Sequence, residues 1–100
     1  MRGCAMSAVN VSECCCRAVE RGSTASAALS IIKRFEIAVA PFDPIQAMDA
    51  ADLRASTRHI GASFGDRACL ALARSRRVPV YTGDRRLAEL DIGVEIRLIR

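Results

Sequence analysis

Three acidic residues, Glu13, Asp66 and Asp84, stand where an expected strand has just ended or an expected helix begins. In open α/β sheets, ligands bind in the crevice beyond the carboxyl ends of the strands. A hard divalent cation is held there by several converging carboxylates rather than by one. A shared cation site is therefore one explanation of the three acids.

Helix capping explains the same residues one at a time. Asp66 lies beside the apolar run in SFGDRACLALA (63–73), where a first-turn carboxylate accepts backbone N–H bonds and stabilises the helix by about 0.5–2 kcal/mol. Glu13 fits a capping box with Asn10, and Asp84 can begin a helix of its own. Taken singly, each acid is explained by capping, so the residues alone leave both explanations open.

The strands and helices that are expected to alternate along the chain must position these acids. The cap at Asp43, followed by Pro44 and Gln46, is typical of a helix start, and Gly61 is expected to close that segment. Apolar runs, caps and glycines together predict strands over 5–9, 36–42, 78–82 and 94–99 and helices over 10–22, 24–34, 43–58, 65–76 and 84–90. This order predicts an α/β fold with an open, mostly parallel sheet flanked by helices.

Length and composition limit the domain organisation. A chain of 100 residues predicts a single domain over 1–100, and 51% hydrophobic with 26% charged residues is typical of a globular protein. The five cysteines have no Cys-x-x-Cys spacing, so we expect small buried side chains rather than disulfides or a zinc site. No apolar stretch approaches the roughly 18 residues of a membrane span, which predicts no membrane partner and, by default, a cytoplasmic location.

The net charge of +4 comes almost entirely from arginine, with clusters at Arg74, Arg76 and Arg77 and at Arg85 and Arg86. Arginine binds phosphate in a bidentate manner that lysine cannot match, so a nucleic acid is an admissible partner. A solvated basic surface accounts for the same charge equally well. Charge alone therefore does not decide between them.

Four strings, SAVNVSE (7–13), SFGDRACLALA (63–73), PVYTGDRRLAEL (79–90) and GVEIRLIR (93–100), together resemble the PIN-domain ribonucleases. The resemblance is strongest to the VapC-type toxins of bacterial toxin–antitoxin pairs, and it covers the whole chain in the family's order. It implies a PIN-like parallel sheet with acids at its carboxyl edge that bind Mg²⁺ or Mn²⁺. Glu13, Asp66 and Asp84 match the family's second, third and fourth acids, and so become the implied catalytic and metal-binding residues.

The function implied by this resemblance is metal-dependent endoribonuclease activity. The implied partners are RNA and a cognate antitoxin protein, with a homodimer as a further admissible assembly. Thr82 is then expected to hydrogen-bond a metal-bound water or a phosphate. Arg85 and Arg86 are expected to contact the RNA backbone.

One departure from the family concerns its first acid, an aspartate that ends the first strand and has no counterpart here. In the family's sheet order that strand is central, between the strands that correspond to 5–9 and 78–82. We therefore expect an N-terminally truncated PIN-like domain with impaired activity, because a central strand contributes ladder hydrogen bonds and buried side chains on both faces.

Two alternatives to an active toxin remain. The first is a non-catalytic remnant, or a decoy that binds antitoxin. The second is a small α/β domain whose helices are capped by acids that form no site. An in-frame apolar strand ending in Asp, encoded upstream of Met1, would favour the ribonuclease.

Overall fold

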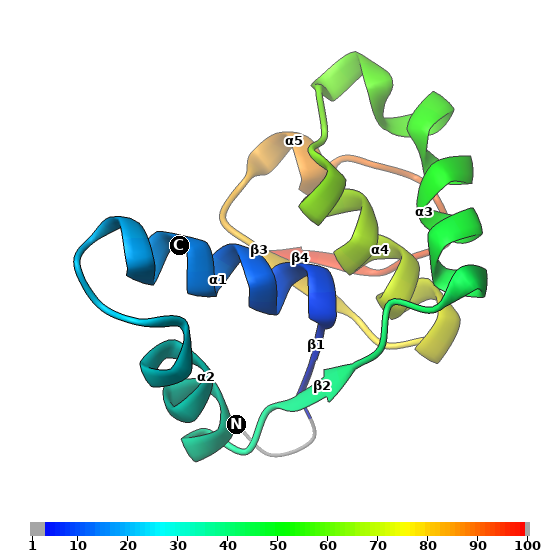
Figure 1. The fold of residues 1–100 in the computed structure, drawn as a ribbon. Helices are drawn as coiled ribbons and strands as arrows, with labels where there is room; N and C mark the ends of the chain where they lie inside the picture. The colour runs from blue at the N-terminus through cyan, green and yellow to red at the C-terminus, as the bar shows by residue number, and fades with distance from the viewer. Residues whose placement is uncertain (1–3, 100) are drawn as a thin grey trace. The chain divides into compact units, whose positions relative to one another are not determined.

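The computed structural model describes residues 4–99, which alternate between short strands and helices (Figure 1). The observed order of strands and α-helices is the predicted one. The chain divides into two compact units, one ending at Phe42 and the other beginning at Asp43, and each is described by itself. Within residues 4–99, no helix has the length and apolar character needed to cross a membrane.

The N-terminal unit is a parallel strand pair with two helices. Its elements are β1 (Ala5–Ser7), α1 (Ala8–Glu20), α2 (Ala25–Arg34) and β2 (Ala38–Ala40). β1 and β2 run parallel with Ala5 opposite Ala38, and α1 packs against α2. Val11 and Ile32 are the buried residues of these two helices, as expected for amphipathic helices that share an interface.

The start of α1 differs from the prediction. Ser7, rather than Asn10, is the N-cap, and its Oγ accepts a hydrogen bond from the N–H of Val9 at 3.2 Å. The helix begins earlier because β1 is only three residues long. Glu13 therefore lies in the second turn of α1 and is not a capping-box residue.

The second unit contains the remaining elements. These are α3 (Pro44–Thr57), a 3₁₀ turn η1 (Arg58–Ile60), α4 (Phe64–Arg76), β3 (Val80–Thr82), α5 (Arg85–Ala88) and β4 (Ile96–Leu98). β3 and β4 pair in parallel with Val80 opposite Ile96, so the predicted α/β class with parallel strands is confirmed. The helix expected over 84–90 is shorter than predicted.

The core of the second unit lies between α3 and α4, which are neighbours in Figure 1. Leu53 and Leu70 are almost fully buried there, and the buried Thr57 hydroxyl donates to the Leu53 carbonyl at 2.7 Å. Asp43 caps α3 as predicted, because its Oδ1 accepts the Gln46 N–H at 2.8 Å. The helical segment ends at Gly61, whose φ of 64° is the left-handed conformation that glycine adopts without strain.

The four strands form two separate pairs, β1–β2 and β3–β4, within the described part of the chain. In a parallel ladder, alternate residues of a strand bond to each neighbouring strand. The Val80 N–H donates to the Glu95 carbonyl at 2.9 Å, and the Ile99 N–H donates to the Thr82 carbonyl at 2.8 Å. The backbone of Tyr81 therefore faces the opposite edge of β3, where no described strand is paired.

Replacement of Leu70 by alanine tests the α3–α4 core. Leu70 is 1% exposed, so Leu70→Ala is expected to lower the free energy of unfolding by about 2–5 kcal/mol through lost burial and a residual cavity. Met48→Ala on the exposed side of α3 is the control and should cost less than about 0.5 kcal/mol. Urea denaturation followed by circular dichroism measures both, and equal losses would contradict this core.

Candidate functional site

Asp66 is held in a capping box at the start of α4. The Asp66 N–H donates to Ser63 Oγ at 3.1 Å, and the Ser63 N–H donates to Asp66 Oδ2 at 3.0 Å. These reciprocal bonds fix the carboxylate in the first turn, where the helix dipole favours negative charge. The capping explanation of Asp66 is thus confirmed, and it places the Asp66 carboxyl group at a defined position.

Arg67 ties this first turn to the neighbouring helix. Its Nη1 donates to the Ala50 carbonyl of α3 at 3.0 Å, and its Cζ lies 5.7 Å from the centre of the Phe64 ring. Its Nε is buried and has no hydrogen-bond partner among the described residues. Sequence reasoning missed this role, although an arginine directly before the apolar run ACLALA is a recognisable signal for a polar contact.

Asp84 is the N-cap of α5 and pairs with Arg86. Its Oδ1 accepts the Arg86 N–H at 2.9 Å, and its Oδ2 lies 3.3 Å from Arg86 Nη2. Hydrogen bonds from the Arg86 side chain, and then from its backbone, lower the pKa of the Asp84 carboxyl from its ordinary value of 3.8. Asp84 is therefore a carboxylate throughout the neutral range.

The residues predicted to contact RNA lie around this cap. The Thr82 hydroxyl accepts the Asp84 N–H at 3.0 Å and so shapes the turn after β3. Both arginines are exposed, and Arg86 is held in the ion pair with Asp84. Of the two predicted arginines, Arg85 has the side chain that is not committed to Asp84.

Glu13 belongs to the N-terminal unit. It is exposed on α1, and its Oε1 accepts a hydrogen bond from Asn10 Nδ2 at 3.3 Å. The capping box predicted for these two residues is wrong, because both lie inside α1, and a side-chain hydrogen bond within the helix joins them instead. That Glu13 shares a cation with Asp66 and Asp84 stays a prediction.

The carboxyl and thiol groups near these helix starts fit a divalent cation only in part. Charged carboxylates suit Mg²⁺ or Mn²⁺, but oxygens of both Asp66 and Asp84 already accept N–H bonds. Burial, and then the charge of Asp66, raise the pKa of the Cys69 thiol, which keeps it protonated and a poor ligand. Across residues 4–99, no three His, Cys, Asp or Glu side chains are grouped to hold a metal ion. Further donors would have to join the two acids.

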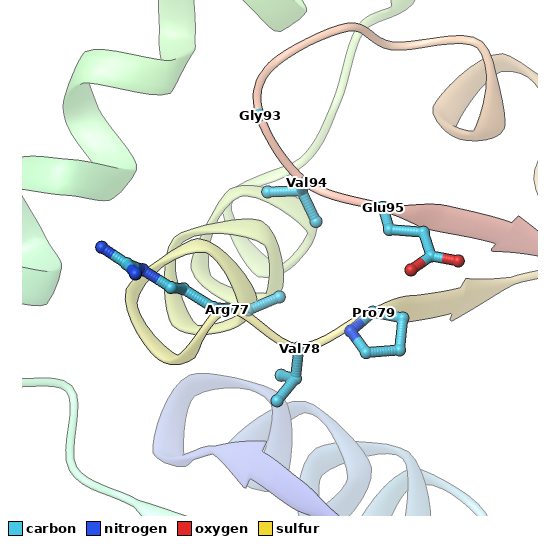
Figure 2. A pocket seen from close by; sticks show the side chains of 7 residues that line it. Arg77, Val78, Pro79, Gly93, Val94 and Glu95 are labelled. Atoms are coloured by element: carbon cyan, nitrogen blue, oxygen red, sulfur yellow. The ribbon is translucent and has the colours of Figure 1, made fainter.

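A pocket of about 180 Å³ lies at the other end of α4 from Asp66. It is formed by Ala73 with residues 77–79 and 93–95. Figure 2 shows the Arg77 and Glu95 side chains directed away from one another. The Glu95 carboxylate instead accepts a hydrogen bond from Arg97 Nε at 2.6 Å. Because its charged groups do not converge, this pocket does not have the features of a reaction site.

The sequence left two possibilities open, a small α/β domain whose acids only cap helices and a member of the PIN-domain family that the chain resembles. Comparison with protein-family models decides between them. A family model described as PIN domain matches residues 2–93. The chain belongs to the PIN domain family. No curated protein matches the chain. PIN domains are generally nucleases that depend on a divalent metal, so the membership points to a nuclease.

The Asp84–Arg86 pair of this PIN domain predicts a defined pH dependence. The pair lowers the pKa of Asp84 in the folded state. The stabilisation that the pair gives the fold is therefore fully present above the unfolded-state pKa. It is lost as the pH falls through the folded-state pKa, which lies below 3.8. Arg86→Gln should raise the Asp84 pKa toward 3.8. Carboxyl ¹³C NMR titration measures the pKa of Asp84 in the wild-type chain and in the Arg86→Gln variant.

Arg85→Gln is the matched control for this titration, because Arg85 neighbours the same cap and its removal leaves the ion pair intact. It should leave the pKa of Asp84 nearly unchanged. Equal increases in both variants would show that general positive charge, rather than the Arg86 contact, lowers this pKa.

Proposed function

We propose that this PIN domain is a metal-dependent endoribonuclease of the VapC type, the toxin of a toxin–antitoxin pair. The observation that carries the proposal is the family match over residues 2–93. Within that range Asp66 and Asp84, which match two of the family's acids by resemblance, are held at helix starts. Asp66 begins α4, and Asp84 follows β3. Three residues separate α4 from β3, and a helix that returns directly into a strand runs antiparallel to it. Both acids are then expected near the carboxyl end of β3.

In this proposal Asp66, Asp84 and Glu13 hold Mg²⁺ or Mn²⁺. When bound, such a cation supplies an acidified water and neutralises charge on the phosphodiester. The contributions of the chain itself are positional. The capping box fixes the direction of Asp66, Arg86 pairs with the Asp84 carboxylate, and Arg85 is available to a phosphate of the RNA.

The open edge of β3 supports the inference that the active form carries one more parallel strand. That strand would end in the aspartate that the family resemblance implies, which adds a carboxylate to a donor set that fits a cation only in part. It would also satisfy the backbone groups of Tyr81 that face away from β4. Without it, we expect weak activity.

The donor set also favours a second candidate function. Both acids of the second unit serve as caps, and within residues 4–99 no three potential ligands are grouped. A non-catalytic remnant or decoy that binds antitoxin is consistent with this arrangement. Cleavage assays separate it from the enzyme, because a decoy binds antitoxin but cleaves no RNA in any form.

Metal binding and capping by Asp66 can be separated by two variants. Millimolar Mn²⁺ should raise the Tm of the wild-type chain, because a ligand that binds only the folded state stabilises it. Asp66→Asn keeps a cap acceptor but removes the charge, so its Tm should no longer respond to metal. Ser63→Ala should cost about 0.5–2 kcal/mol of stability and still show the metal shift. An equal shift in Asp66→Asn would contradict a site at this residue.

Ribonuclease activity is tested with labelled single-stranded RNA in Mg²⁺ or Mn²⁺. The 100-residue chain should cleave far more slowly than a chain extended by an apolar strand ending in Asp, because the extension supplies both a ligand and a paired edge. Asp66→Asn should abolish cleavage by the extended chain, whereas Met48→Ala should not. Inactivity of the extended chain with metal present would contradict the ribonuclease proposal, and equal rates for both chains would contradict the need for the strand.

A further inference from the structure

One face of the β3–β4 pair carries an ordered contact between Tyr81 and Arg97. Arg97 Nη1 donates to the Tyr81 hydroxyl at 2.9 Å, and Arg97 Cζ lies 5.6 Å from the centre of the tyrosine ring. Arg97 Nε also donates to Glu95 Oε2 at 2.6 Å. The guanidinium is thus held from two sides, and it orients the ring.

This face of the strand pair is exposed at Tyr81. Successive side chains of a strand point to opposite faces, so the buried Val80 lies on the face opposite Tyr81. Tyr81 and Arg97 are opposite one another in the register and point to the other face. Tyr81 is 57% exposed, and the Arg97 side chain is 51% exposed. A large aromatic ring is therefore both ordered and accessible.

We propose that the Tyr81–Arg97 pair is a stacking platform for a base of single-stranded RNA. This inference rests on the proposed ribonuclease function and names how that function would select its substrate. Aromatic rings and arginine guanidinium planes are the groups on which unpaired bases stack, and every base offers a face for this contact. Arg97 orders the ring before RNA arrives, which reduces the entropy lost on binding.

The charge of the chain, rather than the residue types of the platform, favours RNA over a protein partner. Tyrosine and arginine are both enriched at protein interfaces, so the Tyr81–Arg97 pair alone does not separate the two kinds of partner. The whole chain carries a net charge of +4, which attracts a polyanion. Because Glu95 neutralises Arg97, the platform itself would add stacking rather than a further phosphate contact.

The platform is close in the chain to Asp84, the candidate acid that follows β3. Tyr81 and Asp84 are three residues apart, so their Cα atoms are separated by at most about 11 Å. A base stacked on Tyr81 would leave a phosphate within one or two nucleotides of Asp84. The platform would thus position the RNA segment next to the proposed cleavage site.

The first test measures RNA binding in EDTA, so that no cleavage is required. Fluorescence anisotropy of a labelled single-stranded 12-nucleotide RNA should show about tenfold weaker binding for Tyr81→Ala, and Tyr81→Phe should stay within about twofold of wild type. Phe35→Ala is the control, because Phe35 is a similarly exposed aromatic residue that lies outside the β3–β4 pair. Equal losses in Tyr81→Ala and Phe35→Ala would overturn the proposal.

The second test uses the absence of tryptophan from the chain. Tyr81→Trp creates a single fluorescent reporter, and its emission should be quenched by the 12-nucleotide RNA but not by an abasic oligomer of the same length. Unchanged emission with both would overturn the platform. So would an emission shift that depends on protein concentration without RNA, because that result would place a second copy of the chain on this face.

The two proposals fail in different ways. If the extended chain cleaves RNA while Tyr81→Trp emission is unaffected by RNA, the platform is wrong and the ribonuclease proposal stands. If no form of the chain cleaves RNA but quenching and the tenfold loss are observed, the chain binds RNA and the ribonuclease proposal is wrong.

Discussion

The first turn of a helix leaves backbone N–H groups without partners inside the helix, and much of the local structure of this chain supplies acceptors for them. Ser7, Thr24, Asp43, Ser63 and Asp84 each accept such a bond, and Asp66 completes the reciprocal box at α4. Each cap defines where the preceding loop or strand must end. The positions of the candidate acids are consequences of this requirement.

In the second unit, the capping of helix starts acts together with the packing of α3 against α4. Arg67 contacts both Phe64 and the Ala50 carbonyl, so the first turn of α4 is fixed along its own axis and against α3. At the other candidate acid, Arg86 serves as a local counter-charge. The two carboxylates therefore differ in their surroundings, since Asp66 is held by backbone and hydroxyl groups and Asp84 is held largely by a cation.

Local signals predicted most of the fold. Asp43 and Pro44 located α3, Gly61 located its end, and the parallel α/β class followed from the order of elements. The start of α1 was wrong because Ser7 and Asn10 are both good caps, and the length of β1, which depends on pairing with β2, decides between them. A local pattern carries no information about that pairing.

The same distinction between local patterns and contacts made by the folded chain applies to the candidate site. Asp66 and Asp84 could be selected from the sequence because helix starts and strand ends are local, and the family strings name the same residues. The contact of Arg67 with α3 and that of Tyr81 with Arg97 join residues 16 or more positions apart, and only the packed chain brings them together. Tyr81 is opposite Arg97 only in the observed register of β3 and β4, and no local pattern in either strand indicates that pairing.

Capping and cation binding are not exclusive functions of these acids. Carboxylates that converge repel one another, and a site for a divalent cation must be stable before the cation arrives. N–H groups at a helix start, or a neighbouring guanidinium, offset part of that repulsion and hold the oxygens in place. The capping box of Asp66 and the Arg86 contact of Asp84 are arrangements of this kind. In this PIN domain, the interactions that begin the helices also hold both candidate acids in defined positions.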